Sequence, residues 1–259
     1  MTSRRLANSN AAKRRAQILT QLREHGHVSV STLAVHYDVT EMTIRRDLRK
    51  LSDDGLATLV HGGARIPAGT GPLAFAARVV DQAAEKQRLG RLVASQLTEV
   101  PVLGIDAGTT TLEVAIHLPP DYRGTVVTHS VPALAALTGK TAAHTIGIGG
   151  DLIPETQALA SNSSLQLLRE LHLSVFLLGA NGLNANGVYV RTALELDIKR
   201  AYIAAAERVH LIVDATKVGS TSAVRVCALD QVDEIITNAP LPPDIASAAR
   251  RAGTIVRIP

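Results

Sequence analysis

The stretch TEMTIRRDLRKL, from Thr40 to Leu51, decides how the N-terminal part of the chain folds. At 3.6 residues per turn, Ile44, Leu48 and Leu51 fall on one apolar stripe, and the basic residues occupy other sides of the helix. Thr40 is a suitable N-cap, and Glu41 favours the positive end of the helix dipole. The pattern therefore predicts a helix that begins after Thr40 and has one buried side and one basic side.

The residues before this helix predict the rest of a helix-turn-helix. A first helix is expected from Lys13 to His25 and a second from Val30 to Tyr37, which Ser29 caps, while residues 1–10 are expected to be frayed. Two short helices joined by a tight turn, the second of them basic, are typical of this motif. Gly55 is the expected end of the basic helix.

A hairpin is expected after the basic helix. Leu56–His61 alternates like a strand, Gly62-Gly63 supplies a turn, and Ala64–Ile66 returns. This pattern predicts the wing of a winged helix, with His61 and Arg65 placed to reach the DNA backbone. We therefore expect a winged helix-turn-helix domain at residues 11–66.

The net charge of +4 is concentrated at the N-terminal end. Residues 1–66 carry 11 Lys and Arg against 6 Asp and Glu, whereas residues 67–259 carry 16 against 17. Such asymmetry indicates a basic module that binds a polyanion, attached to a neutral body. Aromatic residues make up only 2% of the chain, which argues against a protein that stacks single-stranded bases. Duplex DNA is the expected partner.

Cysteine content and hydropathy indicate a cytoplasmic protein. Cys227 is the single cysteine, so an intramolecular disulfide and a multi-cysteine zinc site are excluded. No apolar run is long enough to span a membrane, and the N-terminus lacks the hydrophobic segment of a signal peptide. We expect no membrane association, no metal and no cofactor.

The middle of the chain predicts a connection between two domains. Pro67–Pro72 is rich in Pro and Gly and is typical of a linker. Leu73–Leu97 has one long helical pattern, and such a helix either pairs between subunits or lies on its own domain. We expect a linker and connecting helix at residues 67–85 and a sensor domain at residues 86–259.

From Val102 onward, apolar strands alternate with helical segments, which predicts a Rossmann-like α/β fold with a mostly parallel sheet. The expected strands are Val102–Ile105, Thr125–Thr128, His144–Ile148, Val175–Leu178, His210–Asp214, Glu234–Thr237 and Thr254–Ile258. The expected helices are Thr109–His117, Ser130–Thr138, Ser161–Leu171, Ala193–Ala206 and Asp244–Ala252.

The clearest candidate binding motif is GIDAGTTTLEVAIHL, Gly104–Leu118, in which a strand turns into a helix. At the carboxyl edge of a parallel sheet, the N–H groups of a helix N-terminus are suited to an anion. Gly108 lets the backbone approach a ligand closely, and Thr109–Thr111 add hydroxyl donors. A phosphate-sized anion is the expected ligand, and an ordinary capped turn is the alternative.

Other loops are expected at the same edge of the sheet. Asp214 ends a strand and precedes Lys217 by three residues, and a lysine there supplies a point charge beside an anion. Glu195 and Lys199 are four residues apart on one helix, which is more typical of a solvated surface pair. Further candidates in these loops are Gly149, Gly150 and Asn181.

One continuous segment and six later motifs carry a family resemblance. The segment is VSVSTLAVHYDVTEMTIRRDLRKLSDDGLATLVHGGA, and the motifs are DAGTTTLE, VVTHS, IGGDL, LGANGL, GVYVRTALELDIKR and DATKVG. The first resembles the DNA-binding end of DeoR-type bacterial transcriptional regulators, over about residues 11–66, and the motifs resemble the sensor domain of that family. The resemblance implies a sensor fold similar to ribose-5-phosphate isomerases and a phosphorylated sugar or related metabolite as effector.

The resemblance also implies roles for individual residues of the sensor domain. It implies phosphate contacts from Asp106, Gly108, Thr109, Thr110 and Thr111, and contacts near the sugar from Asn181, Glu195, Lys199, Asp214 and Lys217. This chain has His129 where family members often have Asn, and Asn181 where many have Asp. These departures leave the sugar unidentified.

The basic helix is expected to lie in the major groove. Base contacts are expected from Thr43, Arg45 and Arg46. Phosphate contacts are expected from Thr40, Arg49, Lys50, His61 and Arg65. The whole pattern predicts a repressor of carbohydrate-metabolism genes that binds operator DNA as a homodimer or homotetramer and is controlled by a phosphorylated sugar.

Enzyme functions fit the sequence less well, and no catalytic residue is expected. A DxGTTT loop also resembles that of sugar kinases, but here it leads into a helix, and a second phosphate loop and an adenosine site are missing. A sugar-phosphate isomerase is the main alternative, but its acidic loop is replaced here by GANG, Gly179–Gly182. A dinucleotide site is disfavoured because no GxGxxG follows a strand.

Overall fold

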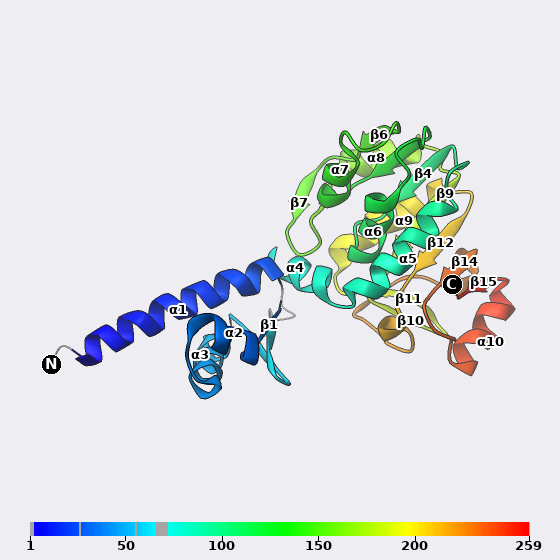
Figure 1. The fold of residues 1–259 in the computed structure, drawn as a ribbon. Helices are drawn as coiled ribbons and strands as arrows, with labels where there is room; N and C mark the ends of the chain where they lie inside the picture. The colour runs from blue at the N-terminus through cyan, green and yellow to red at the C-terminus, as the bar shows by residue number, and fades with distance from the viewer. Residues whose placement is uncertain (1–2, 26, 55, 66–71, 259) are drawn as a thin grey trace. The chain divides into compact units, whose positions relative to one another are not determined.

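The structure is a computed structural model that describes residues 3–25, 27–54, 56–65 and 72–258 (Figure 1). The chain consists of two compact units, Met1–Ala83 and Ala84–Pro259. The first contains the helix-turn-helix and the second contains an α/β sheet. Across the described ranges, no helix is both long enough and apolar enough to cross a membrane.

The N-terminal unit is a winged helix-turn-helix, as the sequence predicts. Its helices are α1 (Ser3–His25), α2 (Val30–Tyr37), α3 (Glu41–Asp53) and α4 (Pro72–Val80). Its strands, β1 (His27–Ser29), β2 (Thr58–Val60) and β3 (Gly63–Arg65), form an antiparallel sheet in the order β1-β3-β2. Gly62 makes the wing turn with φ 75°, a conformation that glycine adopts without strain.

The apolar stripes of the three helices meet in one core. Ile18 and Leu22 come from α1, Leu33 comes from α2, and Ile44 and Leu48 come from α3, and all five are buried. Burial of such side chains stabilises the fold by roughly 1.5–3 kcal/mol each. The core therefore fixes which side of α3 stays exposed.

Two sequence predictions at the start of this unit are wrong. The helix expected from Lys13 begins at Ser3, because residues 3–12 contain neither Pro nor Gly and have no signal that stops a helix. Ser29 is at the N-cap of α2, but its hydroxyl bonds to Ser31 Oγ at 2.9 Å and does not cap the helix. Gly55 and residues 66–71, which include most of the expected linker, lie outside the described residues.

The long helix expected from Leu73 to Leu97 is two helices, α4 and α5 (Ala83–Ser95). Gln82 has a left-handed conformation with φ 54°, which interrupts the helical hydrogen bonds. Ala76 and Ala77 of α4 pack on the core of the N-terminal unit, whereas α5 belongs to the C-terminal unit. The break therefore separates two helices that pack on different cores.

The C-terminal unit is built on seven parallel strands in the order β15-β14-β12-β9-β4-β5-β6. Each lies within two residues of a strand that the sequence predicts, because each is a short apolar run between loops. The strands are β4 (Val102–Ile105), β5 (Thr125–Thr128), β6 (His144–Gly147), β9 (Val175–Gly179), β12 (Val209–Ile212), β14 (Glu234–Ile236) and β15 (Ile255–Arg257).

Helices cover both faces of this sheet. Alternate residues of the central strand β9 point to opposite faces. Phe176 stacks on Tyr202 of α9 (Leu196–Ala205) with ring centroids 4.8 Å apart, whereas Gly179 lies against Thr111 of α6 (Thr109–His117). The helices are α6 (Thr109–His117), α7 (Val131–Leu137), α8 (Asn162–Arg169), α9 (Leu196–Ala205) and α10 (Pro243–Ala252), and the 3-10 turns are η1 (Ala193–Glu195), η2 (Ala215–Lys217) and η3 (Leu229–Gln231).

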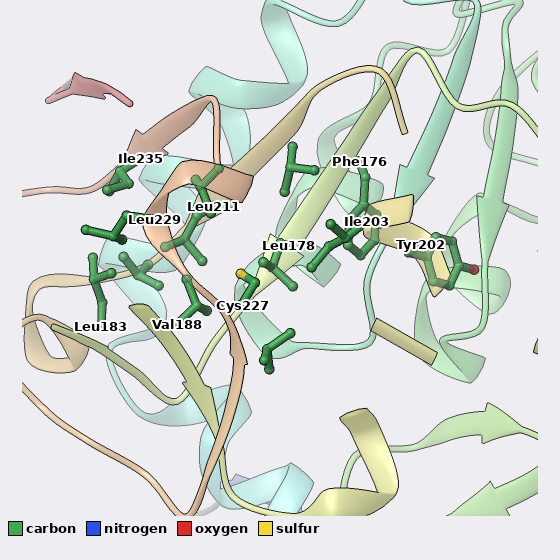
Figure 2. Close-up of a cluster of buried hydrophobic side chains, with 14 of the residues drawn as sticks. Phe176, Leu178, Leu183, Val188, Tyr202, Ile203, Leu211, Cys227, Leu229 and Ile235 are labelled. Atoms are coloured by element: carbon green, nitrogen blue, oxygen red, sulfur yellow. The ribbon is translucent and has the colours of Figure 1, made fainter. Parts of the chain in front are cut away.

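Five further strands are absent from the sequence prediction. They are β7 (Asp151–Ile153), β8 (Ala158–Ala160), β10 (Gly182–Asn184), β11 (Gly187–Val190) and β13 (Val224–Cys227). β10, β11 and β13 form an antiparallel sheet, whose residues Leu183, Val188 and Cys227 join the main core (Figure 2). Gly187 has φ 136°, and an added Cβ would lie 2.1 Å from Cys227 O, so this close pairing requires glycine.

Candidate functional site

α3 presents a basic face on the side away from its core. The hydroxyl of Thr40 accepts a hydrogen bond from Thr43 N at 3.3 Å, which fixes the start of the helix as predicted. Thr43 is half-buried and Thr40 is exposed. The other residues predicted to face DNA are all exposed, and they are Arg45, Arg46, Arg49, Lys50, His61 and Arg65.

The cations on this face differ in their partners. Arg45 pairs with Glu41 at 3.0 Å, and Lys50 pairs with Asp54 at 2.9 Å. Exposed pairs four residues apart on a helix contribute only about 0.2–0.5 kcal/mol, so a phosphate group can displace them. Arg46 makes no ion pair within the described parts of the chain, and its guanidinium is therefore available to a ligand.

Asp47 positions the basic helix, and the sequence pattern did not predict this role. It is only 4% exposed, and its carboxylate accepts hydrogen bonds from Arg14 Nε at 2.6 Å and Arg15 NH1 at 3.3 Å. These charge-assisted bonds fasten α3 to α1. The signal in the sequence was an acidic residue on the apolar stripe between Ile44 and Leu48.

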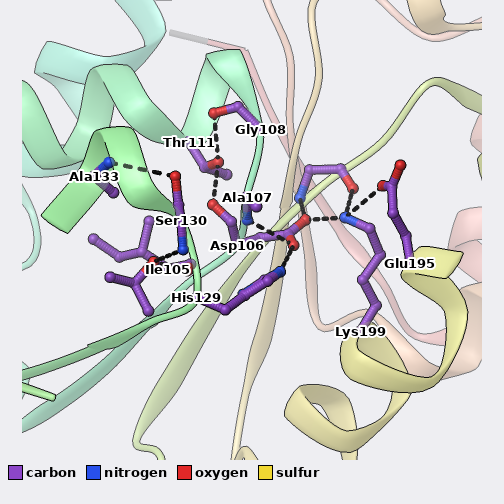
Figure 3. A network of polar contacts seen from close by, with 12 residues as sticks. Ile105, Asp106, Ala107, Gly108, Thr111, His129, Ser130, Ala133, Glu195 and Lys199 are labelled. Carbon is purple, nitrogen blue, oxygen red and sulfur yellow. Dashed lines mark hydrogen bonds and ion pairs between the residues drawn. The ribbon is translucent and has the colours of Figure 1, made fainter. Parts of the chain in front are cut away.

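In the C-terminal unit, Asp106 is the centre of a buried polar network at the end of β4 (Figure 3). Its Oδ1 accepts from Ala107 N at 2.9 Å, and its Oδ2 accepts from Gly179 N at 2.8 Å and from Lys199 Nζ. Lys199 also donates to Gly179 O at 3.3 Å. The carboxylate therefore joins β4, β9 and α9, and both of its oxygens accept hydrogen bonds from protein donors.

Glu195 and Lys199 form part of this network and not a solvated surface pair. Glu195 Oε2 lies 3.7 Å from Lys199 Nζ, and both residues are buried, at 5% and 2% exposure. The alternative that the four-residue spacing favoured is therefore wrong for this pair. The positive charge of Lys199 therefore compensates the negative charges of Asp106 and Glu195 beside the turn that follows β4.

The turn from Asp106 to Thr111 is held from the inside, and only Gly108 and Thr110 in it are partly exposed. The hydroxyl of Thr111 donates a hydrogen bond that two carbonyl oxygens share. The carbonyl oxygen of Asp106 is 2.7 Å from Thr111 Oγ1, and that of Gly108 is 3.1 Å away. Gly108 and Thr110 are half-buried, and Thr109 is 8% exposed. The first N–H groups of α6 have no partner inside the helix, so they are suited to an external acceptor.

His129 lies beside this network at the end of β5. Its Nε2 is 3.7 Å from Asp106 Oδ1, its ring packs against Tyr202 with centroids 5.1 Å apart, and its Nδ1 has no partner within the described residues. Burial lowers the pKa of His129 to about 4, although the carboxylate of Asp106 opposes this effect. His129 is therefore neutral at pH 7.

Asp214 and Lys217 form a second cluster at the end of β12, which β9 separates from β4. Asp214 Oδ1 accepts from Thr216 N at 3.1 Å and from Thr216 Oγ1, whereas its Oδ2 is buried with no partner within the described residues. Lys217 is half-buried. The neighbouring Asn238 accepts from Ala215 N at 2.7 Å. Asp214 thus offers a carboxylate oxygen without a hydrogen-bond partner within the described residues, and Lys217, three residues further along the chain, offers a half-buried cation.

The remaining predicted ligand residues lie at the margin of these clusters. Gly149 and Gly150 are exposed, and Gly150, with φ 138°, leads into the β7–β8 hairpin. In that hairpin Leu159 N donates to His129 O at 2.8 Å, so the hairpin lies over the loop after β5. Asn181 is half-buried, and its backbone N–H donates to Tyr189 O at 2.9 Å. Within the described residues, no group of three or more His, Cys, Asp and Glu side chains could hold a metal ion.

Two family models match this chain. The model of the DeoR-like helix-turn-helix domain matches residues 14–70, and that of the DeoR C terminal sensor domain matches residues 81–239. The chain belongs to the DeoR family. Like the other members, this DeoR-family protein is a DNA-binding transcriptional regulator, as the sequence predicts.

Individual relatives of this DeoR-family regulator are similar over most of their length. The L-fucose operon activator of Haemophilus influenzae is 33% identical over 88% of this chain and 92% of that protein. The Glycerol-3-phosphate regulon repressor of Escherichia coli is 31% identical over 87% of this chain and 90% of that protein. Among solved structures, ribose 5-phosphate isomerase A of Methanocaldococcus jannaschii is 11% identical with a TM-score of 0.38, covering 53% of this chain and 55% of that chain.

Proposed function

We propose that this DeoR-family regulator is a cytoplasmic repressor of carbohydrate-metabolism genes, that it is not an enzyme, and that a phosphorylated sugar controls its binding to operator DNA. The observation that carries the proposal is that one chain contains both an exposed basic helix in a helix-turn-helix and, at the edge of a parallel sheet, a helix N-terminus whose first N–H groups have no partner inside the helix. A relative named for the glycerol-3-phosphate regulon supports a phosphorylated effector.

The DNA interface is the exposed face of α3 together with the wing. The second helix of a helix-turn-helix, which is α3 in this chain, enters the major groove, and its N-terminal residues contact base edges. Thr43, Arg45 and Arg46 are placed for base or near-base contacts, and Arg46 is the best of them because it has no competing ion pair within the described residues. The phosphate contacts come from Thr40, Arg49, Lys50, His61 and Arg65. Two copies in a homodimer or homotetramer bind half-sites about 10 bp apart or a multiple of it.

Replacing Arg46 with alanine is expected to weaken operator binding by about 1–3 kcal/mol and to relax sequence preference at one position of each half-site. The measurement is fluorescence anisotropy with a duplex selected from a random library by the full chain. Lys140→Ala, which removes an exposed cation from the C-terminal unit, is the control and should leave binding unchanged. Equal affinities of the Arg46→Ala protein and the parent would contradict the placement of α3.

The effector site is the first turn of α6 and the loops beside it. The phosphate accepts hydrogen bonds from the N–H groups and hydroxyls of Thr109 and Thr110, and Gly108 lets it come close. Asp106 and Thr111 hold this turn from the inside, and Lys199 and Glu195 complete the buried network around Asp106. These four residues therefore position the site and do not contact the phosphate. The sugar lies near Asn181, Asp214 and Lys217, with Gly149 and Gly150 at the margin.

A phosphorylated sugar that binds here is expected to stabilise the protein by about 2.7 kcal/mol at 100 times its dissociation constant. A thermal-shift screen of sugar phosphates, with the free sugars and inorganic phosphate as controls, measures this. Lys217→Ala should weaken the response, because it removes a cation near the anion. Unchanged responses in that variant would remove Lys217 from the site, and turnover of ribose 5-phosphate would favour an isomerase.

A further inference from the structure

Met42 is an exposed apolar residue in the first turn of α3, and the interface described above leaves it without a role. Its side chain is 74% exposed, and only Val35 exceeds it among the large apolar side chains described. Single exposed apolar residues are common and need no explanation by themselves. The position of Met42 on the recognition helix gives its exposure a meaning.

Met42 lies on the side of α3 that is opposite to its buried residues. Ile44, Leu48 and Leu51 are buried on one side of the helix. At 3.6 residues per turn, Met42 and Arg46 lie on the opposite side, within about 60° of each other. Arg45 is turned to one side, where it pairs with Glu41. Met42 is therefore the first-turn side chain that points most directly away from the core.

The cations around Met42 indicate which kind of partner binds this side of α3. Arg46 and Arg49 are exposed along the same side of the helix, so the surface is complementary to a polyanion and not to an apolar protein partner. In the major groove of duplex DNA, the thymine 5-methyl group is the feature that base edges offer to an apolar side chain. The N-terminal residues of a recognition helix are those that reach base edges.

We propose that Met42 determines specificity by packing against the 5-methyl group of a thymine in each operator half-site. This inference rests on the DNA interface proposed above. Arg46 is one helical turn further along the same side, about 6 Å away, so the base that it contacts lies within about two base pairs of that thymine. The thioether side chain is flexible and polarizable, and it adapts readily to a methyl group.

The test replaces thymine by deoxyuridine, which removes only the methyl group. A duplex selected from a random library by the full-length protein is substituted at one symmetric pair of thymines at a time, and affinity is measured by fluorescence anisotropy. One substitution is expected to weaken binding by the parent protein about fourfold per half-site, since a buried methyl group contributes about 0.8 kcal/mol and 1.4 kcal/mol is tenfold. Met42→Ala should bind the thymine duplex more weakly and lose the discrimination.

Two controls separate this contact from general effects. Arg49→Ala should weaken binding to both duplexes by the same factor and keep the parent's ratio of affinities between them, because a phosphate contact carries no base preference. Val35→Ala, which removes the other highly exposed apolar side chain, should keep the ratio as well. Circular dichroism confirms that each variant is folded.

The outcomes distinguish the two levels of the proposal. If no deoxyuridine substitution weakens binding, or if Met42→Ala keeps the parent's discrimination, the role of Met42 is overturned while the DNA interface stands. If Met42→Ala changes only self-association, the residue faces a second copy and the proposal is also overturned. If the full chain selects no specific duplex, the DNA interface fails together with the role of Met42.

Discussion

Replacing Lys199 with methionine is expected to lower the free energy of unfolding of the C-terminal unit by about 3–5 kcal/mol. The change leaves the carboxylate of Asp106 buried without its cation, and breaking a buried ion pair has an effect of this size. It also removes the hydrogen bond to Gly179 O. Urea unfolding followed by tyrosine fluorescence measures the effect, since Tyr122, Tyr189 and Tyr202 lie in this unit.

Arg88→Met is the matched control for this prediction. Arg88 Nε lies 3.6 Å from Glu85 Oε2, but the two side chains are 56% and 39% exposed. An exposed pair of this kind contributes about 0–1 kcal/mol. If Lys199→Met and Arg88→Met unfold at the same urea concentration, the Lys199–Asp106 pair does not hold the sheet edge together.

Acidification from pH 7 to pH 4 is expected to destabilise the C-terminal unit by about 3 kcal/mol through His129 alone. The folded protein keeps this ring neutral down to a pKa of about 4, whereas the unfolded chain takes up a proton near pH 6.5. The stability is therefore complete above pH 6.5 and is lost as the pH falls from 6.5 to 4. Urea unfolding at a series of pH values measures this loss.

His129→Asn is the variant that isolates this effect, since asparagine does not titrate. Its stability should fall less between pH 6.5 and pH 4 than that of the parent. Both proteins also lose stability on acidification through His210. Burial lowers the pKa of His210 as well, and the carboxylate of Glu234 opposes this effect. An identical pH dependence of the two proteins would show that His129 is not held neutral in the folded state.

The sequence predicts elements whose signal is local. The seven parallel strands are short apolar runs between loops, and α3 has a cap and a clear apolar stripe, so both were found. The strand β13 was missed because its partner β11 lies far earlier in the chain, and β10 and β11 were missed because they are the two short strands of a local hairpin, with only three and four residues. The break at Gln82 was missed because no Gly or Pro marks it, and packing on two separate cores decides it.

The candidate site divides in the same way. Exposure of Arg46 and Arg49 follows directly from helical periodicity, and it was predicted. The burial of Lys199 does not follow from it, because its contact with Asp106 joins residues 93 positions apart. No local pattern predicts that Tyr202 lies beside His129 either. Long-range contacts determine which polar residues hold the turn after β4 and which remain open to a ligand.

The most direct test of effector control is the operator affinity of the full chain, measured by fluorescence anisotropy with and without the sugar phosphate found by thermal shift. We expect the effector to change the affinity about 5–150-fold, the usual range of allosteric coupling. Gly108→Val, which places a side chain where the phosphate approaches, should bind the operator like the parent and lose this response. An equal response in the parent and in Gly108→Val would contradict an effector site at the first turn of α6, and no response in the parent would contradict effector control itself.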